Sequence, residues 1–378
     1  MRFSIPSKIE YVLSVLHNAG HKAYVVGGCV RDLLCGKEPH DFDITTSALP
    51  QEVSALFERT VETGIKHGTV TVIIDRTPIE VTTFRTEGAY INHRRPDSVS
   101  FVSAVDEDLS RRDFTVNAMC YNHSEGLIDL FGGKADIENR ILRAVGEPKA
   151  RFCEDALRIL RLFRFAATLG FSIEEKTLSA AIECAPFLKS ISAERIFAEL
   201  KKASMGNNTV ILNTLLESGA LSHLNIKNAI NKDFSSLPER EDLRLFVLLN
   251  STSDNLSDTL KKLKCSNKFY NYCMTLSRLK PPKDAYGIKK ILNIADYSIL
   301  SDFVDLCGID QSIKKTAKDI IDSGEAYKIS QLSLSGSDIL SLGYSGAQVG
   351  EKLELLLKQV MLDPSLNTKE KLTELLSN

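Results

Sequence analysis

The sequence around residues 26–44 contains Val26-Gly27-Gly28-Cys29-Val30-Arg31-Asp32 and, a short way further on, His40-Asp41-Phe42-Asp43-Ile44. Alternate side chains of a β-strand project from the same face, so we expect Asp41 and Asp43 to point in the same direction. Two neighbouring carboxylates supply the hard oxygen ligands that divalent cations prefer. The aspartate pair therefore predicts a Mg2+ site of the kind used in phosphoryl transfer.

The residues just before the aspartates predict an anion site. Gly27 and Gly28 let the backbone approach a triphosphate closely, and Arg31 supplies a positive charge to neutralise it. Residues 23–26 read as a buried strand, and residues 30–34 as a short helix whose amino terminus would favour phosphate. A lone Asp-x-Asp is most often a solvated turn, and a lone glycine pair is often just a tight turn. Their combination in one run favours the catalytic interpretation.

Two further segments, residues 69–74 and 79–84, are rich in β-branched residues and are separated by a turn-like stretch. This pattern predicts two paired strands. Glu80 and Thr82 share one face of the second strand, because side chains alternate along a strand. Glu80 is therefore a candidate third catalytic carboxylate beside the two aspartates.

Composition narrows the class of protein. The chain has 378 residues, of which 43% are apolar and 25% charged, so we expect several small globular domains. It has no run of about eighteen apolar residues and no apolar leader, which predicts a cytoplasmic protein without membrane contact. The eight cysteines lack CxxC spacing, which argues against a disulfide framework or a zinc site. A net charge of −2 excludes a uniformly basic surface, so RNA contacts must come from local clusters of Arg and Lys.

A second dense cluster, residues 110–119, places two arginines, a carboxylate and an amide before an apolar patch. We expect Arg112 to contact the triphosphate, because its forked donors match phosphate geometry. Asn117 is the candidate for the ribose or its surroundings. Asp113 more plausibly orients an arginine than binds metal. Taken alone, this run is equally well explained as a charged helix start with Asp113 as its cap.

From about residue 141 onward the strand patterns fade, and residues 152–169 show helical periodicity. We expect Asp155, Arg158, Arg161 and Arg164 to lie near one stripe of this helix. The three arginines beside one acid would leave an unneutralised basic edge that suits a nucleotide. The simpler alternative is a surface stripe with an Asp155–Arg158 salt bridge, which contributes little.

An Asp and an Arg together can select a base. A carboxylate only accepts hydrogen bonds and a guanidinium only donates them. A fixed Asp155–Arg158 pair would therefore match the amino group and ring nitrogen of cytosine and adenine, and reject uracil and guanine. A wrong base would leave buried polar groups unpaired, at a cost of about 1–3 kcal/mol per group. Such a choice needs no nucleic-acid template.

Together these runs resemble the class II tRNA nucleotidyltransferase and bacterial poly(A) polymerase family, part of the DNA polymerase β-like nucleotidyltransferase superfamily. The resemblance covers residues 23–202, includes a neck-like motif at residues 193–200, and weakens beyond about residue 205. It implies an α+β fold with a small mixed β-sheet nucleotidyltransferase head followed by an all-helical neck, body and tail. The implied bounds are a head at 1–140, a base-reading neck at 141–205, a body at 206–280 and a tRNA-binding tail at 281–378.

The resemblance also implies roles for individual residues. Asp41 and Asp43 would hold two Mg2+ ions, while Gly28, Arg31 and Arg112 would contact the triphosphate. The family's base reader maps to Asp155 and Arg158, and its further nucleotide and phosphate contacts map to Arg161 and Arg164. Residues 85–96 resemble the flexible loop that switches from C to A addition, although Asn92 stands where many members carry an acid.

The function implied is the template-independent addition of C, C and A to the 3′ end of tRNA from CTP and ATP, with release of pyrophosphate and no obligate protein partner. A-adding, CC-adding and poly(A)-adding enzymes share the same head chemistry and stay open as alternatives. Poly(A) polymerases often carry a longer basic C-terminal extension than residues 372–378 provide. A catalytically inactive RNA-binding protein would be expected to lack the intact Asp41/Asp43 pair. Lysines and aromatic residues at 261–283 either hold tRNA backbone or form an ordinary solvated helix face with the aromatic residues in the core.

Overall fold

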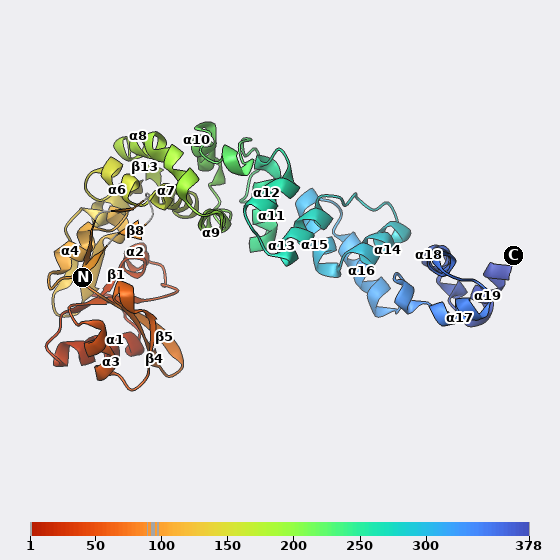
Figure 1. Ribbon diagram of the computed structural model, residues 1–378, viewed down its shortest axis with the longest axis horizontal. Helices are drawn as coiled ribbons and strands as arrows, with labels where there is room; N and C mark the ends of the chain where they lie inside the picture. The colour runs from red at the N-terminus through yellow and green to blue at the C-terminus, as the bar shows by residue number, and fades with distance from the viewer. Residues whose placement is uncertain (1, 89, 92–94, 97, 378) are drawn as a thin grey trace. The chain divides into compact units, whose positions relative to one another are not determined.

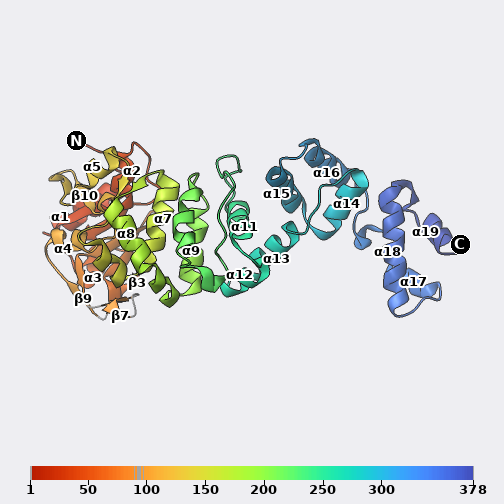
Figure 2. The same cartoon turned by 90° about the horizontal axis from the view of Figure 1, so that it is seen from above.

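The structure, a computed structural model, describes residues 2–88, 90–91, 95–96 and 98–377. The chain forms two compact units, one made of Met1–Ser235 and Ser251–Lys264 and the other of Ser236–Asn250 and Cys265–Asn378. The first unit contains the sheet, and the described residues of the second unit form helices and connecting segments (Figures 1 and 2). The predicted α+β class is confirmed. The finer boundaries at residues 140, 205 and 280 stay a prediction.

A seven-stranded sheet with the order β11-β10-β1-β2-β5-β4-β3 is the centre of the first unit. Its strands are β1 (Ala23–Val26), β2 (Asp43–Thr46), β3 (Thr60–Gly64), β4 (Thr69–Ile74), β5 (Thr77–Thr83), β10 (Met119–Asn122) and β11 (Gly126–Asp129). β2 and β5 run parallel, whereas the other neighbouring pairs are antiparallel, so the sheet is mixed. Three two-stranded ribbons accompany it: β6 (Arg85–Glu87) with β9 (Val99–Phe101), β7 (Tyr90–Ile91) with β8 (Arg95–Pro96), and β12 (Ile141–Leu142) with β13 (Ser172–Ile173).

The predicted hairpin of β4 and β5 is present, and its sequence explains its geometry. Ile74 pairs with Thr77, which leaves Asp75 and Arg76 as the two-residue turn. Both turn residues have positive φ, 45° and 67°, as the twist of a two-residue hairpin requires. Glu80 lies on the exposed face of β5, opposite to the buried residues of that strand.

Helices surround the sheet in the first unit. α1 (Ser7–Asn18) buries Ile9, Val12, Leu13 and Leu16, the predicted apolar stripe. It packs with α3 against the sheet (Figure 1). The other α-helices that lie wholly in the described residues of this unit are α2 (Gly28–Leu34), α3 (Pro50–Leu56), α4 (Val105–Ser110), α5 (Gly133–Glu138), α6 (Pro148–Glu154), α7 (Leu157–Leu169), α8 (Glu175–Cys184), α9 (Ala193–Ala203), α10 (Leu212–Glu217) and α12 (Leu256–Lys262).

The prediction of one continuous helix over residues 152–169 is wrong near its start. α6 ends at Glu154 and α7 begins at Leu157, and between them Asp155 has extended backbone angles, φ −131° and ψ 104°. The Asp155 carboxylate accepts a hydrogen bond from the backbone N–H of Leu157 at 3.1 Å. A short acidic side chain that bonds to nearby backbone competes with helix formation in this way. Asp155 therefore lies in a junction and not on the helical stripe of Arg158.

The second unit contains most of α11 (Glu241–Thr252) and two apolar cores. The first core includes Leu292, Leu300 and Val304, and the second includes Leu356 and Val360. Its remaining α-helices are α13 (Asn267–Leu276), α14 (Ala285–Ile294), α15 (Tyr297–Cys307), α16 (Ser312–Asp322), α17 (Gly336–Ser341), α18 (Ala347–Leu362) and α19 (Lys369–Ser377). Across the described ranges, no helix combines the length and apolar character needed to cross a membrane.

The close approach of Gly206 to α7 gives a test of the fold. A Cβ atom on Gly206 would lie 2.4 Å from the carbonyl carbon and oxygen of Ala167. Because backbone atoms cannot move aside as a flexible side chain can, Gly206→Ala should lower the free energy of unfolding by about 1–3 kcal/mol, measured by urea denaturation. In the control Gly64→Ala the added atom would lie 3.4 Å from the Thr69 Cβ, so a much smaller loss is expected. Equal losses in the two variants would contradict this packing.

Candidate active site

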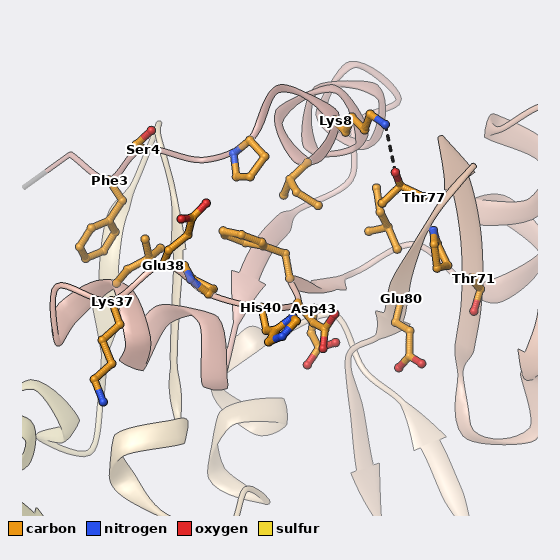
Figure 3. Close-up of a pocket in the computed structure, with 18 of the residues that line it drawn as sticks. Phe3, Ser4, Lys8, Lys37, Glu38, His40, Asp43, Thr71, Thr77 and Glu80 are labelled. Atoms are coloured by element: carbon orange, nitrogen blue, oxygen red, sulfur yellow. Dashed lines mark hydrogen bonds between the residues drawn. The ribbon is translucent and has the colours of Figure 1, made fainter. Parts of the chain in front are cut away.

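Strand pairing brings carboxylates together at one end of the sheet. Val26 of β1 pairs with Asp43 of β2, and the next residue of β2, Ile44, pairs with Val81 of β5. Glu80 precedes Val81 and so occupies the register position beside Asp43. The two carboxylates project in the same direction (Figure 3). β2 begins at Asp43, so Asp41 lies just before the strand and not on it, contrary to the expectation that both aspartates are strand residues.

The charges of these carboxylates act on one another. The pKa of Asp43 is raised above its ordinary value of 3.8, first because the surrounding protein removes water from the carboxylate and next because of the charge of Glu80. Asp41 adds to the increase, and the positive charge of Arg112 opposes it. Such concentrated negative charge is stabilised by a bound cation.

The oxygen donors fit a metal ion that completes its shell with other ligands. Among the residues that the structure describes, no group of three or more His, Cys, Asp or Glu side chains is arranged to hold a metal ion. A divalent cation held by Asp41 and Asp43 would therefore need water and substrate oxygens to complete its shell. That these two residues bind Mg2+ stays a prediction. The assignment of Glu80 as a third catalytic carboxylate stays a prediction.

The turn after β1 requires glycine and is lined by arginine. Gly27 has φ 80° and ψ −126°, a backbone conformation that side chains disfavour. A Cβ atom there would also lie 2.9 Å from Nη1 of Arg112. Gly28 begins α2, which is a helix of seven residues. We therefore assign the predicted anion site to the backbone of the turn and its arginines, and not to the dipole of so short a helix.

Asp108 of α4 anchors two arginines. Its side chain is 0% exposed, and it pairs with Arg111 at 2.6 Å and with Arg112 at 3.2 Å. Burial alone would raise the pKa of Asp108, but the charges and hydrogen bonds of the two arginines outweigh it, so the pKa is lowered. Sequence reasoning missed Asp108. The available signal was its spacing of three and four residues before the arginine pair, which is typical of helical ion pairs.

A chain of hydrogen bonds joins α2 to α7. Arg31 donates to the side-chain oxygen of Asn117 at 2.8 Å, and Asn117 donates to Asp113 at 3.3 Å. The other carboxylate oxygen of Asp113 accepts from Nε of Arg161 at 2.7 Å. Asp113 thus orients an arginine, as its sequence context suggested. The structure gives Asn117 a bridging position, and its predicted contact with ribose stays a prediction.

The predicted Asp155–Arg158 ion pair is not formed, because each residue has another partner. Asp155 pairs with Arg195 of α9 at 2.8 Å, and Arg158 pairs with Glu154 at 2.6 Å. Arg158 also donates to the backbone oxygens of Arg151 at 3.3 Å and Arg111 at 3.1 Å. The break between α6 and α7 moves Asp155 off the helix, which explains the difference. The sequence signal for Arg195 was its place in the neck-like motif, whereas Glu154 was overlooked.

The predicted unneutralised basic edge on α7 is also wrong. Arg161 pairs with Asp113 at 2.6 Å, and Arg164 pairs with Glu199 of α9 at 2.8 Å. Both carboxylates come from elements remote in sequence, so the local pattern of three arginines and one acid could not reveal them. The hydrogen-bond chain through Asp113 and Asn117 connects Arg161 to Arg31 of α2.

A cavity of about 1170 Å³ borders the carboxylates (Figure 3). Asp41, Asp43 and Glu80 line one part of it, and Phe3 and Lys8 of the amino-terminal segment line another. The described residues that line it do not include the glycine turn or its arginines. The carboxylates therefore border two separate surfaces, the arginine-lined turn and this cavity.

Two further predicted elements are partly described. The loop expected to switch between C and A addition includes Asn92, which lies outside the described residues. In the predicted basic and aromatic region, Phe269 is buried and the hydroxyl of Tyr272 donates to Asp302 at 2.6 Å. Phe269 therefore belongs to the core, as in the simpler explanation of that region, whereas Tyr272 is half-buried. A tRNA contact by its lysines stays a prediction.

Comparison with known proteins agrees with this site. Residues 23–143 match the family described as "Poly A polymerase head domain", and residues 170–228 match "Probable RNA and SrmB- binding site of polymerase A". The CCA-adding enzyme of Streptococcus pyogenes serotype M2 is 36% identical over 398 residues, covering 97% of each chain. The CCA-adding enzyme of Streptococcus gordonii is 52% identical over 225 residues, which are 58% of this chain and 56% of that one. The crystal structure of the Bacillus stearothermophilus CCA-adding enzyme in complex with CTP has a TM-score of 0.84 at 31% identity, covering 97% of this chain and 96% of that one.

The mixed sheet presents carboxylates beside an arginine-lined glycine turn. Together with the head-domain match, this arrangement defines a nucleotidyltransferase. The alignment along almost the whole length then settles the family. This chain belongs to the family of CCA-adding enzymes, as its sequence motifs predicted.

The lowered pKa of Asp108 predicts how a variant should respond to pH. The stabilisation from a carboxylate with a lowered folded pKa is fully present above its unfolded pKa of about 4, and is lost as the pH falls through the folded value. Asp108→Asn should therefore lower the free energy of unfolding by about 1–3 kcal/mol near pH 7. The difference from wild type should shrink below about pH 4, measured by urea denaturation over a pH series.

Asp106→Asn is the matched control, because Asp106 is an exposed aspartate on the same helix. This variant should stay close to wild type. If Asp108→Asn lowered the free energy of unfolding by the same amount at all pH values, the carboxylate charge would not be what holds the arginines.

Proposed function

We propose that this chain adds C, C and A in turn to the 3′ end of tRNA, using CTP and ATP and releasing pyrophosphate. The observation that carries the proposal is the position of Asp43 beside both Glu80 and the Arg112-lined turn at Gly27. Carboxylates provide the reaction centre, and the arginines provide the triphosphate site. The family match along the whole chain supports the choice of tRNA as substrate.

Enzymes of this family use a divalent metal, and we propose Mg2+ held by Asp41 and Asp43. When bound, Mg2+ would favour the ionised form of the attacking hydroxyl and neutralise charge on the leaving pyrophosphate. The clustered, oxygen-only donors and the raised pKa of Asp43 fit such an ion. We place the reaction in the cytoplasm, which suits a chain whose eight cysteines are all free.

The chain's own residues position the reactants. The backbone at Gly27 and Gly28 and the guanidinium groups of Arg31 and Arg112 hold the triphosphate, so the α-phosphate faces the carboxylates. Arg112 is fixed for this task by Asp108, and Arg31 by Asp32 and Asn117. Because these groups are held before substrate arrives, little reorganisation is needed during the reaction.

The 3′ end of the RNA would approach from the cavity that Phe3 and Lys8 help to line. An attacking hydroxyl and a leaving pyrophosphate lie roughly in line on opposite sides of the phosphorus atom. If the triphosphate occupies the arginine-lined turn, the hydroxyl must come from the other surface that the carboxylates border. Lys37 and His40 also line this cavity and offer hydrogen-bond donors to RNA phosphates.

Asp155 and Arg158 would both contact the base, and each of the two is held by a different ion-pair partner. Arg195 holds Asp155, and Glu154 holds Arg158, so the acceptor and the donor are fixed independently. A carboxylate acceptor and a guanidinium donor match cytosine and adenine and mismatch uracil and guanine. Arg161 and Arg164 extend the arginine group from this region toward Arg31.

An addition assay tests the activity. Purified protein is incubated with tRNAs that end before CCA, after C and after CC, each with CTP, ATP, UTP or GTP. We expect C on the first two substrates, A on the third, and a complete CCA end with CTP and ATP together. A addition to the CC-ended tRNA alone would contradict full CCA addition, and long A tracts would indicate a poly(A) polymerase.

Asp43→Asn supplies the matched catalytic control in the same assay. It should reduce nucleotide addition by about a thousandfold or more, because one of two metal-binding carboxylates is lost, while tRNA binding in a filter assay stays intact. A variant with wild-type activity would remove the basis of the proposal. Absence of addition by the wild type, with tRNA binding retained, would favour the inactive RNA-binding alternative.

Base choice is tested with Arg158→Ala. Loss of the guanidinium should lower the preference for CTP over UTP by about tenfold or more, measured as a ratio of kcat/KM values. Arg151→Ala is the control, because Arg151 also pairs with Glu154, at 2.7 Å, but has no predicted contact with the base. Unchanged selectivity in Arg158→Ala, or an equal loss in Arg151→Ala, would exclude Arg158 as a base reader.

A further inference from the structure

Phe165 of α7 lies at the centre of a group of arginines. The guanidinium carbons of Arg31, Arg161 and Arg164 lie 5.3, 5.5 and 3.9 Å from the centroid of its ring. Phe114 meets the ring edge-on, with centroids 5.8 Å apart and an interplanar angle of 83°. Only 7% of Phe165 is exposed. One buried ring therefore contacts cations from α2 and from α7, elements that are remote in sequence.

The geometry of α7 explains why these groups meet. Arg161 lies four residues before Phe165, so the two side chains share one face of the helix. Arg164 directly precedes Phe165, and its ion pair with Glu199 at 2.8 Å holds its guanidinium group over the ring. Arg31 reaches the same ring from α2. The ring is thus a shared contact for three cations that have different carboxylate partners.

Bringing three guanidinium groups together has an electrostatic cost. The pKa of Arg164 is lowered to about 10, first because the group is buried; the charge of Glu199 opposes this decrease, and the charges of Arg161 and Arg31 add to it. The face of an aromatic ring carries a partial negative charge that attracts guanidinium groups. Phe165 therefore offsets part of the repulsion without a formal negative charge. A further carboxylate in its place would compete with an anionic ligand for the same arginines.

We propose that Phe165 is a positioning residue for the triphosphate of the incoming nucleotide, because its ring holds Arg31, Arg161 and Arg164 together as one group of guanidinium donors. The inference rests on the proposed function and deepens it at the same site. Phe165 acts through the arginines and is not a catalytic residue. Because the arginines contact phosphate and not the base, the effect of Phe165 is the same for CTP and ATP.

The test compares Phe165→Leu, which removes the aromatic face, with Phe165→Tyr, which keeps it. Phe165→Leu should raise the KM for CTP and the KM for ATP by a similar factor of about ten, with a smaller change in kcat and none in the KM for tRNA. The inhibition constant of inorganic tripolyphosphate, used as a competitive inhibitor, should rise by the same factor. Phe165→Tyr should restore values close to wild type.

Phe163→Leu is the matched control, because Phe163 is a fully buried phenylalanine on the same helix. It should lower the Tm without raising either KM. Wild-type KM values in Phe165→Leu, an effect on one nucleotide alone, or an equal rise in Phe163→Leu would overturn the proposal. If Phe165→Leu does not fold, Phe165→Met replaces it, since Met fills irregular space without an aromatic face.

The outcomes separate this inference from the proposed function. If the wild-type protein adds no nucleotide to any tRNA, the proposed function fails. The role of Phe165 is then decided by calorimetric binding of inorganic tripolyphosphate to wild type and Phe165→Leu. Weaker binding by the variant supports the positioning role, and equal binding overturns it.

Discussion

The pairing of β2 with β1 on one side and β5 on the other is the constraint on which the site depends. Because Val26 pairs with Asp43, the glycine turn begins beside the aspartate. Because β5 runs parallel to β2, it brings Glu80 to the same end of the sheet. A slip of β2 by one residue would exchange the faces that Asp43 and Ile44 occupy. The burial of Ile44, which is 1% exposed, therefore secures the position of the carboxylates.

The parts of this arrangement that are encoded locally could be predicted from the sequence. The apolar spacing of α1, the glycines after β1 and the alternation along β5 each specify structure within a few residues. Glu80 is an example, because the buried residues on either side of it in β5 determine which face it occupies. The strand at residues 23–26 that precedes the glycine turn also followed from local pattern. The family assignment succeeded for the same reason, since its motifs are short and contiguous.

Some partners of the charged side chains could not be predicted, because they come from distant parts of the chain. Helical spacing pairs residues three or four apart, so it coupled Asp155 to Arg158. In the structure Asp155 instead contacts Arg195, 40 residues away, and Arg161 contacts Asp113, 48 residues away. A single local event causes the first difference: the Asp155 carboxylate accepts from the backbone of Leu157 and ends the helical pattern. Periodicity contains no information on such tertiary contacts.

Local and distant partners together determine how rigidly Arg158, the proposed base reader, is held. Arg158 is 8% exposed, and its guanidinium donates to a carboxylate and to two backbone oxygens. Moving it would leave those acceptors unsatisfied, at about 1–3 kcal/mol for each buried group. Moving Arg158 to suit uracil or guanine would therefore cost free energy. In the proposed site, the hydrogen-bonding groups of a wrong base would stay without partners. Two bases with a common pattern of donor and acceptor can be accepted by such a rigid site, and this is sufficient to separate C and A from U and G without a template.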